Sequence, residues 1–127
     1  MPRTRKDEAP IAVSEPMIEG RYVELDDYTV SFESFPIASD PSPLFAGLPD
    51  GRCQCPHWGY VVRGSFSANY RDGQEETFHA GDAYFLRPGH LTKLGAGAEV
   101  VEFSPTKDLQ ETMAVVGANM EAGVQVR

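Results

Sequence analysis

Glycine and proline interrupt this chain so often that no long regular element fits between them. The 127 residues include 12 glycines and 10 prolines, and both residue types favour turns over the interior of a helix. Apolar runs are correspondingly short, so we expect no membrane-spanning helix and no membrane partner. The length suits one domain, and the spacing of the breaks favours many short strands.

Short segments with strand-like alternation fill residues 28–105. In residues 28–35, Val30 and Phe32 fall on one face of a strand and polar side chains, Glu33 among them, on the other. The other strand-like segments are residues 58–63, 65–71, 77–79, 83–86 and 99–103, with an Asp72-Gly73 hairpin signal after the second. This spacing predicts an all-β fold, an antiparallel sandwich or barrel.

Three stretches depart from this strand pattern. Residues 1–20 mix charges and prolines without a period, which predicts a mobile N-terminal arm ahead of a single domain over residues 21–127. Residues 36–51 hold four prolines, which predicts a long irregular loop that covers the barrel mouth. Apolar residues at helical spacing predict one amphipathic helix over residues 106–120, with Thr106 as its N-cap.

The charge balance narrows the class of partner. Lys and Arg number 11 against 19 Asp and Glu, a formal net charge of −8, and three of the basic residues lie within the first six positions. An acidic surface repels a phosphate backbone, so nucleic acid is excluded as an expected partner, whereas a neutral or cationic small molecule fits. Two cysteines and no apolar leader segment favour a reducing cytoplasm.

The segment Cys53-Gln-Cys55-Pro-His57 carries the most specific chemical signal. In an extended chain, alternate positions point to the same side, so two thiols and one imidazole would converge. Such donors suit a divalent transition metal, Zn, Fe or Cu, better than Mg or Ca. Two alternatives stay open: thiols buried for packing beside a core histidine, or a disulfide, for which Cα atoms about 6.5 to 7 Å apart lie at or past the usual limit.

Other polar side chains carry weaker signals. Tyr60, Tyr70 and Tyr84 lie on predicted strands and are interpreted as sheet packing residues. His79 flanks a turn and is interpreted as a surface residue. The sequence assigns no catalytic residue.

The chain resembles a small single-domain cupin, a conserved β-barrel of the double-stranded β-helix or jelly-roll type. The resemblance is carried by the runs His57-Trp-Gly-Tyr-Val-Val-Arg-Gly64, Asp72-Gly73 and Ala80-Gly-Asp82 through Arg87-Pro-Gly-His90. It covers roughly residues 28–105. It implies a barrel in which the motifs H-x-H-x3-E-x6-G and G-x5-P-x-G-x2-H hold one divalent metal.

The ligand positions of those motifs are altered in this chain. His57 stands where the family has its glutamate, Cys53 where it has its second histidine, and Gly51 where it has its first. Thr92 takes the position of the last histidine, and His90 lies two residues before it. We therefore expect a relocated metal site of four residues, Cys53, Cys55, His57 and His90.

Two kinds of metal site remain open for this set. Two thiolates and two imidazoles would close a tetrahedral structural zinc site, whereas a cysteine held off the metal would leave a position for water, substrate or oxygen. The resemblance implies a metal-dependent enzyme on a small organic molecule, of oxygenase, isomerase or cyclase type. The alternatives are a non-catalytic metal or small-ligand sensor and a structural zinc site only. The resemblance also implies a homodimer, as in many small cupins.

Overall fold

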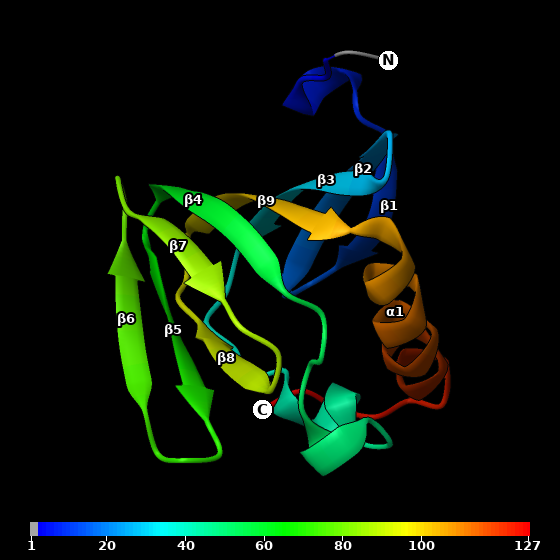
Figure 1. Cartoon of the computed structure of the whole chain (residues 1–127), viewed down its shortest axis with the longest axis vertical. Coiled ribbons are helices and arrows are strands. Elements are labelled where there is room, and N and C mark those ends of the chain that lie inside the picture. The colour runs from blue at the N-terminus through cyan, green and yellow to red at the C-terminus, as the bar shows by residue number, and fades with distance from the viewer. Residues whose placement is uncertain (1–2) are drawn as a thin grey trace.

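The structure, a computed structural model, describes residues 3–127 (Figure 1). The strands are β1 (Ile11–Glu15), β2 (Ile18–Leu25), β3 (Tyr28–Phe35), β4 (His57–Arg63), β5 (Ser65–Tyr70), β6 (Glu75–His79), β7 (Ala83–Leu86), β8 (His90–Leu94) and β9 (Ala98–Pro105). One helix, α1 (Thr106–Glu121), and three 3-10 turns, η1 (Lys6–Glu8), η2 (Ser42–Phe45) and η3 (Pro49–Gly51), complete the described elements.

The strands form two antiparallel sheets. The larger has the order β1-β2-β3-β9-β4-β7 and the smaller the order β6-β5-β8, as Figure 1 shows. Apolar side chains from both sheets meet between them, among them Val61, Phe66, Phe78 and Leu86. The predicted all-β antiparallel fold with one C-terminal helix is confirmed.

Most of the predicted elements are in place. The segments that alternate in residues 28–105 all form strands, and Asp72-Gly73 joins β5 to β6. Residues 36–51 are irregular apart from the two short turns, and Asn119 of α1 donates to the carbonyl oxygens of Leu44 and Ala46 at 2.7 and 2.9 Å. The loop is thereby fixed against the helix.

The N-terminal prediction needs correction. Residues 11–15 and 18–20 belong to β1 and β2, which pair as a hairpin at the edge of the larger sheet, so the boundary at residue 20 falls inside a strand. Pro16 lies in the turn, where the missing N–H costs no ladder bond. Residues 1 and 2 of the predicted arm lie outside the described residues.

Two smaller differences concern β8 and the start of the helix. The sequence did not indicate β8, because only two of its five residues are aliphatic and one is a lysine. Thr106 is the first helical residue rather than the cap, and its Oγ1 lies 2.8 Å from Oγ1 of Thr29. No helix within residues 3–127 has the length and apolarity needed to cross a membrane.

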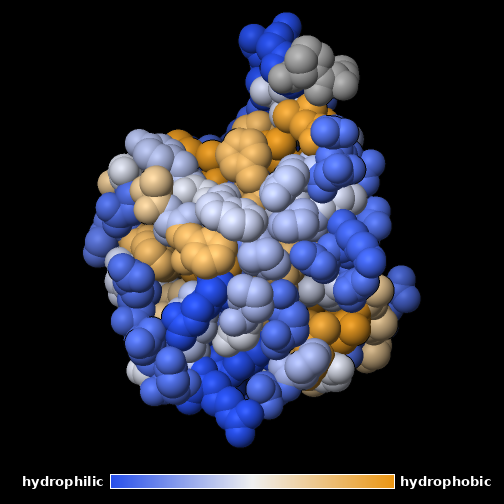
Figure 2. All heavy atoms as spheres, viewed as in Figure 1, coloured by the Kyte–Doolittle hydropathy of each residue, from blue (hydrophilic) through white to orange (hydrophobic). Residues whose placement is uncertain are grey.

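The outer face of the larger sheet carries exposed aromatic side chains. Tyr28, Trp58, Phe85 and Phe103 come from four strands, β3, β4, β7 and β9, and each is 43–47% exposed. The rings of Trp58 and Phe85 lie 5.0 Å apart, and Trp58 lies opposite Phe103 in the ladder. Figure 2 shows hydrophobic side chains in several separate groups on a largely hydrophilic face.

Candidate metal centre and its cavity

A cavity of about 160 Å³ lies inside the barrel. Its walls are mainly apolar side chains from both sheets, the 36–51 loop and α1, among them Leu44, Phe45, Met113 and Val116. The polar groups in the lining include the side chains of Tyr22, Ser31, Glu33, Cys53, His57, His90, Thr92, Glu102 and Thr112. Three of the four residues predicted as metal ligands are therefore on one cavity wall.

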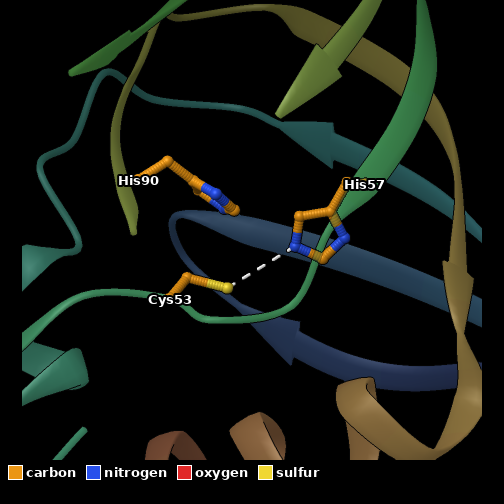
Figure 3. A group of neighbouring side chains, drawn as sticks. All are labelled: Cys53, His57 and His90. Carbon is orange, nitrogen blue, oxygen red and sulfur yellow. Dashed lines mark hydrogen bonds between the residues drawn. The ribbon is translucent and has the colours of Figure 1, made fainter. Parts of the chain in front are cut away.

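Cys53, His57 and His90 form the group that could hold a metal ion. One donor atom from each lies within 4.8 Å of the others, and all three residues are buried. Figure 3 shows the Cys53 thiol and the His90 ring directed toward His57, with Sγ of Cys53 3.6 Å from Nε2 of His57. The two rings meet edge to face with centroids 5.2 Å apart.

The backbone brings these three residues together from separate parts of the sequence. His57 and His90 are the first residues of β4 and β8, so they lie where each strand enters the barrel. Cys53 forms an isolated bridge with His90, in which its N–H donates to the His90 carbonyl oxygen at 3.0 Å. Because this bridge fixes both backbones, the Cys53 thiol and the His90 imidazole lie on the same wall of the cavity.

Hydrogen bonds outside the group orient both imidazoles. Nδ1 of His90 lies 2.7 Å from the carbonyl oxygen of Arg87, and because a carbonyl only accepts, this nitrogen carries the hydrogen. Nε2 of His90 therefore presents its lone pair. Nδ1 of His57 lies 2.6 Å from Oγ of Ser104, so its Nε2 is the nitrogen that faces Cys53.

Burial keeps all three groups uncharged in the absence of a cation. It lowers the pKa of His57 and of His90 to about 4, and it raises the pKa of the Cys53 thiol to about 11. Neutral imidazoles coordinate a metal without losing a proton, whereas the thiol must lose one. A bound cation would offset the cost of that buried thiolate, so the donor set fits a transition metal.

Cys55 lies outside this group. Its buried Sγ is 4.0 Å from Nδ1 of His57, whereas Cys53 approaches Nε2, and it donates to the carbonyl oxygen of Pro56 at 3.4 Å. Burial raises the pKa of Cys55 to about 12. Both cysteines are free thiols. The structure thus unites Cys53, His57 and His90 and leaves Cys55 beside the other ring nitrogen of His57.

Two tyrosine–carboxyl pairs lie beside the candidate metal centre, and three of their four members, Tyr22, Glu33 and Glu102, line the cavity. The Tyr84 hydroxyl donates to Oε2 of Glu102 at 2.6 Å, and the Tyr22 hydroxyl donates to Oε2 of Glu33 at 2.8 Å. Oε1 of Glu102 lies 3.7 Å from Nδ1 of His57. This second group of polar residues therefore reaches the candidate metal centre through Glu102.

The register of the larger sheet explains why these side chains meet. Tyr22, Ser31, Glu102, Gly59 and Tyr84 lie side by side on five adjacent strands. Paired residues in an antiparallel ladder share a face of the sheet, so the row points into the barrel as a whole.

Two glycines make room for the tyrosine rings. A Cβ atom at Gly59 would overlap the phenol of Tyr84, and one at Gly20 would lie 2.7 Å from the Tyr22 hydroxyl oxygen. Gly20 pairs with Glu33, and Gly59 pairs with Glu102. Each tyrosine ring therefore lies over a glycine and reaches the glutamate that pairs with this glycine.

The carboxyl groups of Glu33 and Glu102 are largely buried, and within residues 3–127 neither pairs with a lysine or an arginine. Burial raises the pKa of Glu33, as does the nearby Glu102, and burial also raises the pKa of Glu102 itself. The phenol pKa values of Tyr22 and Tyr84 are raised by burial and by the neighbouring carboxylates. At neutral pH the cavity therefore contains phenols that stay protonated and carboxyls held close to their point of ionisation.

These pairs were not predicted from the sequence. Tyr84 was interpreted as a packing residue, and Glu33 was grouped with the polar residues of a strand whose inner face was not assigned. The structure places Ser31, Glu33 and Phe35 toward the cavity. The available signal was Gly59 within a strand, because a glycine there marks a close approach by another group.

Similarity to solved structures identifies the fold. No protein-family model and no curated protein matches the chain. KdgF from a Halomonas species is 20% identical with a TM-score of 0.54, over 80% of this chain and 90% of that chain. An RmlC-like cupin from Shewanella frigidimarina is 18% identical with a TM-score of 0.55, over 80% and 88%. The polyketide cyclase RemF from Streptomyces resistomycificus is 16% identical with a TM-score of 0.55, over 83% and 79%. The chain has the cupin fold.

Proposed function

We propose that this chain of cupin fold is a metal-dependent enzyme that acts on a small organic molecule inside its barrel. The observation that carries this function is the convergence of three donor atoms, from Cys53, His57 and His90, within 4.8 Å in the wall of a 160 Å³ cavity. Three protein ligands leave further positions for a substrate, as in catalytic metal sites.

The donor set favours a divalent transition metal, Zn, Fe or Cu. When bound, such an ion would supply Lewis acidity to a substrate oxygen or nitrogen. Cys53, His57 and His90 would hold it, and the bonds to Arg87 and Ser104 keep both Nε2 atoms directed into the site.

The tyrosine–carboxyl pairs favour proton transfer as the reaction, of the isomerase or cyclase type, over oxygenation. Glu33 and Glu102 have raised pKa values, so each can hold or release a proton near neutral pH. Tyr22 and Tyr84 fix one oxygen of each carboxyl, which leaves the other oxygen to exchange a proton with a substrate. Apolar side chains make up most of the lining around them, which lowers the local polarity.

A non-catalytic sensor or a structural zinc site remains the alternative. A structural site would need a closed set of four protein ligands. Cys55, the fourth predicted ligand, lies beside Nδ1 of His57 and outside the group of three donors, which favours the open site.

The exposed aromatic face defined by Tyr28, Trp58, Phe85 and Phe103 supports a homodimer. A flat apolar patch on a sheet is self-complementary under a two-fold axis, whereas the remaining surface is strongly acidic. A second copy that covers these rings would remove them from water. Two free thiols fit a reducing compartment, and we assign the protein to the cytoplasm.

Deuterium exchange tests the proton-transfer function. The metal-loaded protein is incubated in D₂O with a library of small carbonyl compounds and amines, and NMR detects deuterium at carbon. We expect incorporation for at least one compound, with loss in Cys53→Ser and in Glu33→Gln and retention in Cys55→Ser. Exchange that persists in metal-free Cys53→Ser would contradict a metal-dependent reaction.

A further inference from the structure

The formally charged side chains of the cavity lining are acidic. Across the part of the chain that the structure describes, the lining includes Glu33 and Glu102 and no lysine or arginine. Three basic side chains next in sequence to lining residues are engaged elsewhere: Arg21 donates to Glu19, Arg52 to the carbonyl oxygen of Asn69, and Arg87 to Asp72. The two buried carboxyls therefore lack a protein cation.

One carboxyl oxygen is left without a donor. The Tyr22 hydroxyl occupies Oε2 of Glu33, and within residues 3–127 no other donor forms a hydrogen bond with this carboxyl. Ser39 Oγ is the only fully buried side-chain polar atom without a partner among the described residues, so Oε1 of Glu33 is accessible, and Glu33 lines the cavity. Oε1 of Glu33 is thus positioned to accept a hydrogen bond from a ligand.

The rest of the lining sets the size and polarity of that ligand. The side chains of Leu44, Phe45, Leu109, Met113 and Val116 are all apolar and lie on the loop and helix that close the cavity. A cavity of about 150 Å³ lined by apolar groups accommodates benzene. A volume of about 160 Å³ therefore suits a molecule of roughly six heavy atoms with a mostly hydrocarbon body.

We propose that the ligand of this cavity is a small, mostly apolar amine whose ammonium group binds the carboxyls of Glu33 and Glu102. This substrate class rests on the proposed function for its place beside the metal centre, while binding of the ammonium itself requires no metal. An ammonium group donates to Oε1 of Glu33 and supplies the missing positive charge. A carboxylate ligand would instead meet two like charges in a desolvated space.

Charge balance supports the same class when the centre is loaded. A divalent ion and the Cys53 thiolate together leave one positive charge, and the two carboxylates bring the site to one negative charge. A monocation makes the site neutral, which minimises the cost of burying its charges. With a neutral ligand, one of the carboxyls must instead take up a proton to remove that charge.

Calorimetric titration with matched ligands tests this assignment. The probes are cyclopentylamine, its neutral counterpart cyclopentanol, and cyclopentanecarboxylate. Binding is measured first on protein freed of metal by a chelator that is then dialysed away, so that coordination of the amine to a metal does not enter, and then with Zn²⁺ added. We expect the amine to bind at least about tenfold more tightly than the alcohol, and the carboxylate to bind least.

Two variants assign the preference to the carboxyl. Glu33→Gln keeps the shape of the side chain and removes its charge, so it should abolish the preference for amine while retaining affinity for the alcohol, which also reports an intact cavity. Glu76→Gln, an exposed position on β6, should leave the preference unchanged.

The outcomes separate this substrate class from the proposed function. Equal or weaker binding of the amine, no binding of the amine, or an unchanged preference in Glu33→Gln would overturn the assignment. A metal-binding protein without amine preference would leave the metal centre standing and reject the amine. Amine preference in a protein that takes up no metal would support the carboxyl site and reject the metal-dependent function.

Discussion

His90 donates its Nδ1 hydrogen to the carbonyl oxygen of Arg87 across 2.7 Å. This bond fixes the tautomer and the direction of the ring, so the Nε2 lone pair is directed toward Cys53 and His57. The direction of the His90 Nε2 lone pair is therefore set by the protein and requires no bound metal. At His57, Nδ1 lies 2.6 Å from Oγ of Ser104, a hydroxyl that orients the ring and can either donate or accept.

Removing one of the three donor side chains should weaken metal binding far more than removing the neighbouring Cys55 thiol. We expect Cys53→Ser and His57→Ala each to lower the affinity for Zn²⁺ at least about tenfold, because three donors are few to begin with. Competition with a chromophoric chelator measures the affinity. Cys55→Ser is the matched control, and a loss in this variant as large as in Cys53→Ser would show that both thiols bind the ion.

Ionisation of Glu33 should make the metal-free protein less stable at high pH. A carboxyl with a raised pKa in the folded state binds more protons there than in the unfolded chain, so its contribution to stability is present at low pH and is lost as the pH rises through the folded pKa. Urea unfolding at about pH 6 and about pH 9 should show a decrease in wild type that is smaller in Glu33→Gln. The same decrease in both proteins would contradict a buried, uncompensated carboxyl.

The histidines act in the opposite direction at lower pH. Burial lowers their pKa from 6.5 to about 4, so the unfolded chain binds more protons than the folded chain between these values. Their contribution to stability is therefore complete above about pH 6.5 and is lost as the pH falls toward 4. His90→Gln should reduce this acid sensitivity in urea unfolding below about pH 6, and unaltered sensitivity would indicate that His90 is protonated in the fold.

A methyl group at Gly59 should disturb the Tyr84–Glu102 pair. The added Cβ overlaps the Tyr84 phenol, so Gly59→Ala should cost about 1–3 kcal/mol in unfolding free energy. Gly117→Ala is the control, since a Cβ there meets nothing within 4 Å and alanine favours a helix by about 1 kcal/mol. If both variants were equally stable, the close approach at Gly59 would not be needed.

A charge on the exposed aromatic face should prevent dimerisation. We expect a dimer mass by light scattering at tens of micromolar concentration for wild type and a monomer mass for Trp58→Lys, because a buried lysine would lack a partner. Ile37→Lys, equally exposed but on the 36–51 loop, should remain dimeric. A wild-type monomer would reject the homodimer.

Much of the fold was predictable because its signals are local. Hairpin turns, strand alternation and the spacing of Leu109, Met113 and Val116 each depend on a few neighbouring residues. The β1–β2 hairpin was missed because Pro16 and the surrounding charges are typical of a flexible arm, whereas pairing with the sheet is a long-range interaction. Propensity does not report such tertiary contacts.

The candidate site was predictable only in part, for a similar reason. Alternation placed Cys53, Cys55 and His57 on one side, but residues 53–56 do not form a regular strand, so Cys55 lies beside Nδ1 of His57 while Cys53 lies beside Nε2. Glu33 was not recognised because inward-facing residues of a strand are usually apolar, and only a barrel with an internal cavity accepts a carboxyl there.

X-ray absorption at the metal edge of protein purified without chelator tests the metal centre most directly, since it reports the element, its amount and its ligands together. We predict about one equivalent of a divalent transition metal with one sulfur ligand at about 2.3 Å, two imidazole nitrogens and at least one light, exchangeable ligand. Less than about a tenth of an equivalent after reconstitution, or a closed shell with two sulfur ligands and no exchangeable position, would contradict the open site formed by Cys53, His57 and His90.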